Sequence, residues 1–222
     1  TIAEEGKYTV EGAVTFSVEY TAETYAITFD EGITVKDGTT DVASGTLVAY
    51  GTTLTVTADP KAGYTSVLSA SAGTIAEEGK YTVEGAVTFS VVHTPIKYTV
   101  TWIIEGSDNI ETKVDFGATI TAPEDPTREG YSFTGWDTKP ETMPANNIEV
   151  TATWTVNKYT VTWNNYDGTV FRTVELDYGT IITKPAEIPT KDSTAEFEYT
   201  FSEWTDFTEG MTVTEDKTFN RY

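Results

Sequence analysis

Carboxylates are abundant in this chain, but the partners that most catalytic sites give them are scarce. The sequence holds 35 Asp and Glu residues, a single histidine, His93, and no cysteine. A zinc site needs more His and Cys side chains than this chain has. The one histidine lies in a segment interpreted as a linker between modules, which disfavours a nucleophile–histidine pair. It also lacks the Gly-x-Ser-x-Gly, phosphate-loop and dinucleotide-binding patterns. We therefore predict that the protein is not an enzyme, with no catalytic residues and no cofactor.

Acidic turns are the remaining candidates for binding a metal. They lie at Asp108-Asn109, Glu124-Asp125 and Asp167-Gly168. Calcium needs six to eight oxygen ligands from a convergent loop, and the spacing of such a loop is absent. The turns are therefore interpreted as solvated loops, and no metal site is predicted.

Aromatic side chains are the strongest candidates for ligand binding, since exposed rings bind sugars and proteins. A module of about 60–70 residues without disulfides, however, needs large side chains to fill its core. Three tryptophans lie on the apolar side of alternating segments and are predicted to be core: Trp102, Trp154 and Trp163. The other two, Trp136 and Trp204, follow segment ends. They are the candidate binding residues, although a core position is also the favoured interpretation for them.

The segments that carry these rings alternate apolar and polar residues. The pattern appears in residues 25–29, 53–58, 97–102, 148–154 and 158–163. Period-two alternation is typical of half-buried antiparallel strands. No segment keeps a helical stripe over three turns, and prolines limit any helix in residues 123–129 or 184–188 to a turn or two. The fold class predicted is mainly β, with at most short helices.

The chain is also repetitive. Residues 1–18 (TIAEEGKYTVEGAVTFSV) recur letter for letter at 74–91. We interpret residues 1–21 as the closing part of a preceding repeat, followed by a first module (22–96), a second (97–156) and a third (157–222). Each module opens on an aromatic strand, then has Tyr50-Gly51, Phe116-Gly117 or Tyr178-Gly179, and closes on an alternating strand. Short linkers between such modules favour an elongated rod.

Residues 98–154, and above all PTREGYSFTGW at 126–136, resemble the Listeria–Bacteroides repeat of the internalin B-repeat type. Residues 158–222 are similar to it more loosely, with Glu203 where a glycine precedes tryptophan in the family pattern, so the turn there should differ. Residues 25–92 resemble divergent relatives of the repeat. The resemblance implies small β-grasp-like modules of mixed strands with a short helix. It also implies bacterial surface proteins in which such repeats act as spacers and sometimes as adhesive elements.

The duplicated segment suggests an exchange of strands. Because residues 8–18 have the sequence of residues 81–91, they fit the same place in the first module, and swapping is a low-cost route to dimers. The alternative is a loosely packed hairpin. The candidate exchange residues alternate along the segment: Tyr8, Val10, Val14, Phe16 and Val18.

A formal net charge of -21 makes nucleic acid and anionic membranes poor partners. No apolar run is long enough to insert into a membrane. We predict an extracellular location, at the cell surface or in the cell wall of a Gram-positive bacterium. The modules are interpreted as a non-catalytic stalk that projects a distal domain. The alternative is an adhesin whose exposed aromatics or edge strand bind host protein or glycan.

Overall fold

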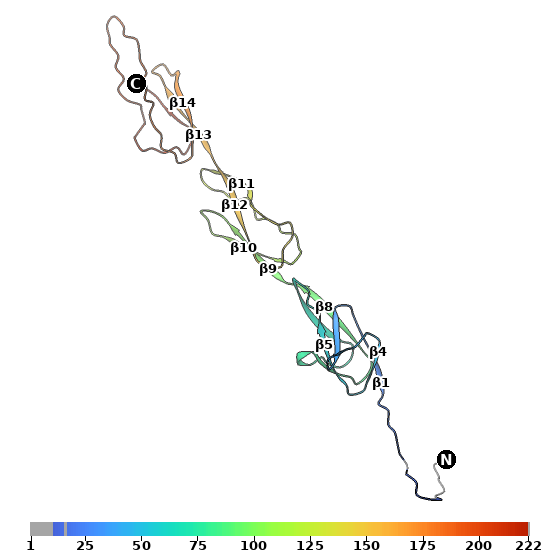
Figure 1. Cartoon of the computed structure of the whole chain (residues 1–222). Helices are drawn as coiled ribbons and strands as arrows, with labels where there is room; N and C mark the ends of the chain where they lie inside the picture. The colour runs from blue at the N-terminus through green and yellow to red at the C-terminus, as the bar shows by residue number, and fades with distance from the viewer. Residues whose placement is uncertain (1–10, 16, 222) are drawn as a thin grey trace. The chain divides into compact units, whose positions relative to one another are not determined.

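The computed structural model describes residues 11–15 and 17–221 and divides into two units, residues 1–95 and 96–222. Its described part is nearly all β (Figure 1). The one helical element there is a short 3-10 turn, η2 (Glu77–Gly79). No helix in this part of the chain is long and apolar enough to cross a membrane. The mainly-β fold class is therefore confirmed.

The first unit has two four-stranded sheets. One has the order β4-β1-β8-β6 and the other β3-β2-β5-β7. The strands are β1 (Thr24–Phe29), β2 (Ile33–Asp37), β3 (Thr40–Asp41), β4 (Thr46–Ala49), β5 (Thr53–Ala58), β6 (Tyr64–Ala70), β7 (Lys80–Thr82) and β8 (Val87–Pro95).

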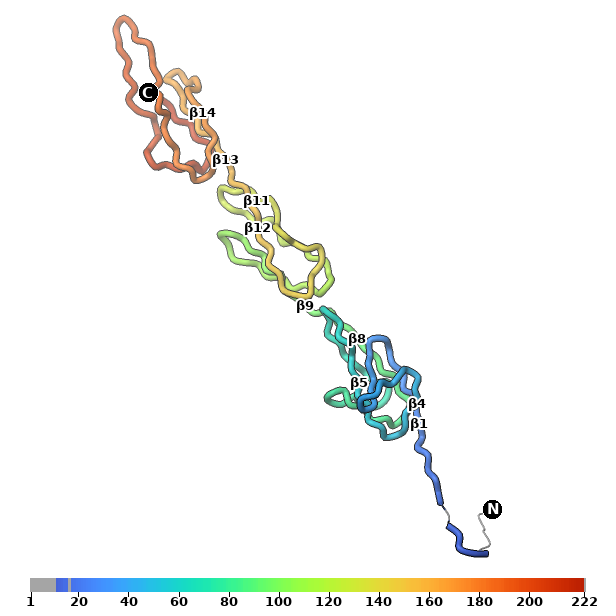
Figure 2. Tube along the Cα trace, viewed as in Figure 1, coloured from blue at the N-terminus to red at the C-terminus, as the bar shows by residue number. Residues whose placement is uncertain are grey.

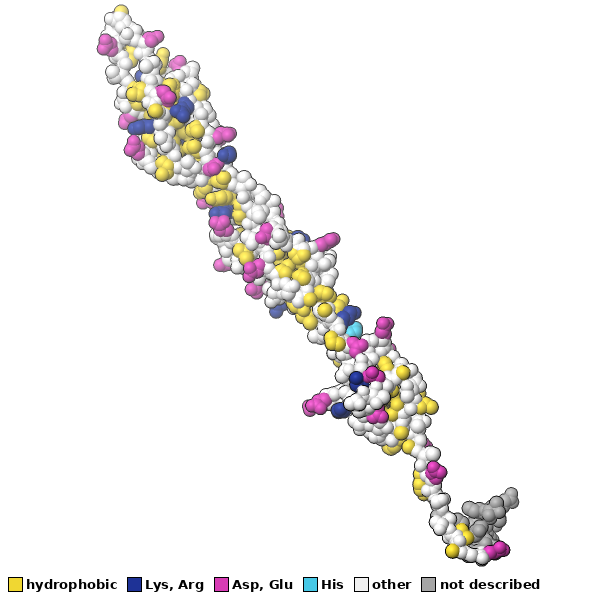
Figure 3. Space-filling model, viewed as in Figure 1, with side chains coloured by type: hydrophobic (Ala, Val, Ile, Leu, Met, Phe, Trp, Pro, Cys, Tyr) yellow, Lys and Arg dark blue, Asp and Glu magenta, His cyan; other side chains and the backbone are white. Residues whose placement is uncertain are grey.

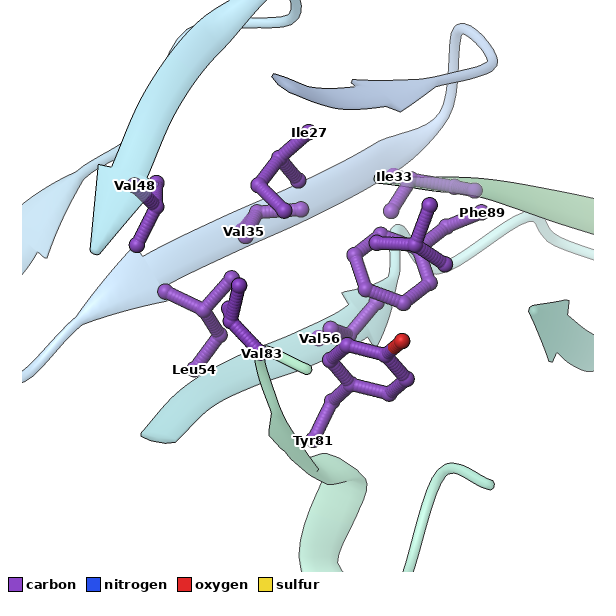
Figure 4. Packing of buried hydrophobic residues seen from close by; sticks show 10 residues of the cluster. Ile27, Ile33, Val35, Val48, Leu54, Val56, Tyr81, Val83 and Phe89 are labelled. Carbon is purple, nitrogen blue, oxygen red and sulfur yellow. The ribbon is translucent and has the colours of Figure 1, made fainter. Parts of the chain in front are cut away.

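The alternating residues of both sheets meet in one core (Figure 4). Ile27 of β1 and Leu54 of β5 are fully buried. The rings of Tyr81 and Phe89 pack edge to face with centroids 5.0 Å apart. The Tyr81 hydroxyl remains satisfied by donating to the Ala72 carbonyl oxygen at 2.9 Å, so a large amphipathic side chain fills the core without leaving a polar atom unpaired.

The second unit carries one four-stranded and one three-stranded sheet with separate cores. The second module has the order β10-β9-β12-β11 and the third has β14-β13-β15. The strands are β9 (Lys97–Ile103), β10 (Ile110–Asp115), β11 (Tyr131–Trp136), β12 (Ile148–Val156), β13 (Lys158–Asn164), β14 (Val170–Asp177) and β15 (Lys217–Phe219). One core surrounds Val100, Trp102 and Val150, and the other surrounds Val161, Trp163 and Phe219.

The strand that opens each module pairs in parallel with the strand that closes it. The pairs are β1 with β8, β9 with β12 and β13 with β15. The expectation of antiparallel strands was therefore wrong for these pairs, whereas the mixed pairing implied by the family resemblance is present. Alternation cannot separate the two cases, because it reports which face is buried and not the direction of the neighbouring strand.

The short helices expected as the most that the prolines would allow are not formed. Residues 123–129 and 184–188 contain no helix. In the second module, residues after Phe116 instead form an isolated bridge, Thr119 with Thr142, which places Ile120 and Met143 in the core. The third module repeats this arrangement with the bridge of Ile181 with Thr212. In the first module the same layer is a full strand pair, β5 with β7.

Candidate functional site

The two tryptophans proposed as binding residues pack against core tryptophans. Trp136 lies edge to face on Trp102 with ring centroids 4.8 Å apart, and Trp204 lies on Trp163 at 4.9 Å. Trp204 is only 6% exposed, and Trp136 is half-buried. The structure thus gives both rings the same position in successive modules, with most of each ring engaged by protein.

Local sequence explains how Trp136 turns into the core. The register of β11 against β12 shifts between Phe133 and Gly135, and Gly135 has a φ of +136°. Such a bulge reorients the next side chain and favours glycine. Glu203 occupies this place in the third module, where the structure has only the isolated bridge of Trp204 with Arg221 instead of a strand. The predicted difference between the two modules is seen here.

Of the three tryptophans predicted to be core, Trp102 and Trp163 are almost completely buried. Trp154 is half-buried and packs on Phe133 with ring centroids 5.5 Å apart. The guanidinium of Arg128 lies 6.0 Å from the Trp154 ring. Trp154 therefore caps the edge of its module instead of filling the centre.

Arg128 organises the PTREGY segment, a role that the sequence analysis did not assign. Its Nη1 and Nη2 donate to the two carboxylate oxygens of Glu105 at 2.7 and 2.9 Å. Its guanidinium also lies 3.8 Å from the centre of the Tyr131 ring. The segment thus joins a bidentate ion pair to a cation–π contact.

The third module has a comparable cation–aromatic cluster that sequence reasoning also missed. Arg221 is 5% exposed and donates from Nη1 to the Pro189 carbonyl oxygen at 3.0 Å. Lys191 Nζ lies 3.9 Å from the ring centre of Tyr199 and 4.4 Å from that of Tyr166. In these contacts the cations pack on aromatic rings of the same module, so we interpret the cluster as stabilising the packing of the long segment between β14 and β15.

The second and third modules meet at a contact between a glycine–tyrosine turn and a tyrosine ring. A Cβ atom added to Gly130 would lie 2.1 Å from ring atoms of Tyr178, so this ring covers the glycine directly. The rings of Tyr131 and Tyr178 are 6.3 Å apart and those of Tyr159 and Tyr178 are 6.4 Å apart. A hydrogen bond to the Glu129 carboxylate raises the pKa of the Tyr178 phenol above its usual value. We call residues 129–131, 157, 159 and 178 the junction.

Backbone hydrogen bonds align the two sides of the junction. Asn157, the single residue between β12 and β13, donates its N–H to the Gly130 carbonyl oxygen at 2.9 Å. It also accepts at its own carbonyl oxygen from the N–H of Tyr178, at 2.9 Å. The chain passes from β12 to β13 without an intervening loop (Figure 2). The junction is therefore built from main chain as well as side chains.

The remaining polar candidates make ordinary local contacts. His93 lies on β8, and its Nδ1 is 2.8 Å from the Ser66 hydroxyl oxygen. Asp167 accepts from the hydroxyl and N–H of Thr169, which lowers its pKa. No group of three His, Cys, Asp or Glu side chains that could hold a metal occurs among the described residues. On the visible faces, acidic side chains are scattered and do not gather in one patch (Figure 3).

The candidate exchange segment is only partly described. Tyr8, Val10 and Phe16 lie outside the described residues. Val14 and Val18 are 40% and 72% exposed and belong to no strand. Strand exchange and self-association through residues 8–18 stay a prediction.

Comparison with known proteins gives two matches to the Listeria-Bacteroides repeat domain, at residues 98–158 and 159–221. Internalin H of Listeria monocytogenes serovar 1/2a is 34% identical over 151 residues, which cover 60% of this chain and 26% of that protein. A protein of Evansella cellulosilytica is 34% identical over 100 residues, covering 40% of this chain and 15% of that protein.

The chain thus spans about a quarter, or less, of the length of these curated relatives. Among solved structures, Streptococcal High Identity Repeats in Tandem domains 3-4 from a cell surface protein share 19% identity. That match covers 61% of this chain and 98% of the other, with a TM-score of 0.25.

Proposed function

Because this chain belongs to the Listeria-Bacteroides repeat domain family, we propose that its modules are non-catalytic spacers of a bacterial cell-surface protein. In this proposal they hold a distal domain away from the cell and carry mechanical tension while doing so. The proposal rests mainly on one observation, the parallel pairing of the strands that open and close each module.

Parallel terminal strands determine how a module resists tension along the chain. In the second module, Ile148 to Thr151 of β12 pair in parallel with Val100 to Ile103 of β9. Tension enters at the start of β9 and leaves at the end of β12, so it acts to slide the two strands past each other. All the rungs of the ladder are then loaded together, whereas pulling the ends of an antiparallel hairpin breaks one rung at a time.

The core lies directly on this loaded ladder. Trp102 and Val150, which are paired across it, are both fully buried. In the third module Trp163 and Phe219 are paired in the same way and are also buried. Sliding the strands must therefore break the hydrogen bonds and uncover apolar surface in one step, which supports a high barrier to forced unfolding.

Tension passes from one module to the next through very little chain. A single residue, Ile96, separates β8 from β9, and Asn157 separates β12 from β13. The closing strand of one module therefore leads almost directly into the opening strand of the next. No long linker is available to extend before the ladders are loaded.

The proposed location is extracellular, at the cell surface or in the cell wall of a Gram-positive bacterium. The membership of the repeat family and the similarity to Internalin H of Listeria monocytogenes support it. The acidic charge, spread over the chain, suits a solvated surface that neither nucleic acid nor anionic lipid attracts.

Single-molecule pulling of the whole chain from its ends tests the spacer function. We expect separate unfolding steps, which release roughly 20 nm for the ~60 residues of the second or third module and roughly 25 nm for the ~75 residues of the first, at the extended length per residue. A force–extension curve that rises smoothly, with no unfolding step above the thermal noise of the measurement, would contradict the proposal.

The alternative function is adhesion to host protein or glycan. The burial of Trp204 and the packing of Trp136 on Trp102 favour the spacer. Acrylamide quenching, combined with glycan and host-protein arrays, separates the two functions. The spacer proposal expects shielded tryptophans and blank arrays, and a reproducible array signal that Trp136→Ala removes would establish adhesion.

A further inference from the structure

The first module displays the same tyrosine surface that the third module uses at the junction, but without a partner on it among the described residues. Tyr50 follows β4 as Tyr178 follows β14. Tyr178 is half-buried beneath the turn at Gly130, whereas Tyr50 is 58% exposed. A turn packed on Tyr50 in the way that the Gly130 turn packs on Tyr178 would account for this difference in exposure.

The backbone around the two tyrosines is the same. Tyr50 donates its N–H to the Glu23 carbonyl oxygen at 2.8 Å, and Tyr178 donates to that of Asn157 at 2.9 Å. The next residue, Gly51, donates to Val83 at 2.7 Å, and Gly179 donates to Val213 at 2.8 Å. Glu23 therefore holds the place that Asn157 holds in the junction.

The side chains of the first module are also arranged as in the third. The rings of Tyr25 and Tyr50 are 6.5 Å apart and inclined at 60°, and those of Tyr159 and Tyr178 are 6.4 Å apart and inclined at 57°. A hollow lined by Ala22, Glu23 and Tyr50 lies beside them. The receiving half of a junction is thus already formed on the first module.

We propose that the surface formed by Ala22, Glu23, Tyr25 and Tyr50 is a docking site for the glycine–tyrosine turn of another repeat of this chain's type, joined directly ahead of residue 22. The inference does not depend on the spacer function, because docking between repeats would occur in an adhesin as well.

The sequence provides the occupant with matching geometry. Residues 1–18 repeat residues 74–91. In the first module this segment ends within β8, which pairs with β6, and β6 starts just after Gly63. Tyr64 is in register with Pro95, one residue before Ile96, and Tyr131 is in register with Val156, one residue before Asn157. By the same spacing, the turn tyrosine of the docked repeat lies opposite Ala22, next to Tyr50.

Glycine is required in the turn that docks. Gly63 and Gly130 both have a positive φ, +80° and +76°. At Gly130 the tyrosine ring also occupies the space of a Cβ atom. Glu198 stands before the corresponding tyrosine of the third module, Tyr199, so that module does not carry a turn of the required kind. The docking site accordingly selects repeats of the first and second type.

The proposal is tested by adding residues 22–73 ahead of Thr1, so that residues 1–18 complete a second copy of the first module. In the added copy Tyr50 is replaced by Ala, which reacts slowly with hydroxyl radicals and gives the added peptide a different mass, so that the original Tyr50 is the reporter at this position. Hydroxyl-radical footprinting read by mass spectrometry then compares Tyr50 in the chain of 222 residues and in the lengthened chain. We expect its oxidation to fall several-fold, to the rate of Tyr178 in the same sample.

A matched variant carries Tyr64→Ala in the added copy only, which removes the docking ring and should restore most of the oxidation of Tyr50. Unchanged oxidation in the lengthened chain overturns the proposal when circular dichroism shows that the added copy is folded. If the copy does not fold, residues 97–156 are placed directly before Glu23 instead, since this module presents the Gly130 turn in the structure. An unprotected Tyr50 in that chimera also overturns the proposal.

Discussion

The junction predicts that two glycines with the same backbone conformation respond differently to alanine. Gly130 and Gly117 lie in the same module, and both have a φ of +76°. A Cβ atom at Gly117 meets nothing within 4 Å, whereas one at Gly130 would lie 2.1 Å from the Tyr178 ring. Gly117→Ala is therefore a matched control, because it introduces the same backbone strain without a clash against the Tyr178 ring.

The expected magnitudes follow from these two contributions. Each substitution places alanine in the left-handed region, at a cost of about 1–2 kcal/mol. Gly130→Ala must also displace the Tyr178 ring from Tyr131, which adds about 0.5–1.5 kcal/mol for the lost aromatic pair. The extra cost has this upper limit, because the ring can leave the junction without unfolding either module.

Urea unfolding followed by tryptophan fluorescence measures the difference. All five tryptophans lie between Trp102 and Trp204, so the signal reports on the second and third modules. In a Tyr178→Ala background the clash is absent, and we expect the two glycine variants to become equally stable. Equal destabilisation in the wild-type background, or a difference that persists without Tyr178, would refute the role assigned to the junction.

Three further predictions concern the cores, the PTREGY segment and pH. Trp102→Ala should destabilise the second module by about 3–5 kcal/mol, because the ring is fully buried; amide hydrogen exchange should show lost protection of β9 and β12 while β13 keeps its own. Glu105→Gln should lower the free energy of unfolding by only about 0.5–1 kcal/mol, since this carboxylate is largely exposed. Arg128→Ala should lower it further in the same urea titration, because this substitution also uncovers the Tyr131 ring, and equal losses of stability would contradict the cation–π contact. Because the pKa of Tyr178 is raised in the folded protein, the stability that this shift contributes is complete below the unfolded value of about 10 and is lost as pH rises through the folded value. Ultraviolet titration of the tyrosines should show that the shift disappears in Glu129→Gln. A titration curve that this substitution leaves unchanged would exclude the hydrogen bond between Tyr178 and Glu129.

Much of the fold could be predicted from the sequence because one-sided sheets impose alternation. Residues 25–29, 97–102 and 158–163 were predicted as strands and occur as such. The alternation also identified Trp102 and Trp163 as core residues. It could not give the direction of pairing, which depends on how residues far apart in the chain return to the same sheet.

The junction could not be predicted from single residues. Tyr50-Gly51, Phe116-Gly117 and Tyr178-Gly179 recur at the same place in the three modules, but the recurrence does not show what this position contacts. The tyrosine of this motif packs on the glycine that precedes Tyr131. Only glycine, which has no side chain, leaves room for a ring to lie on the backbone at that point. Arg128 was missed for a similar reason, because its partner Glu105 lies in a distant turn.

The proposed function depends on the direction in which tension loads the ladder of the second module. Since the chain has no cysteine, handles can be attached at introduced pairs. Lys97→Cys with Val156→Cys pulls the parallel strands β9 and β12 along each other. Lys97→Cys with Asp115→Cys instead pulls apart two residues that are paired across β9 and β10, which opens this hairpin one rung at a time. We expect a clearly higher unfolding force for the first pair in optical-tweezer measurements. Equal forces for the two pairs would show that the parallel ladder does not bear the load as proposed.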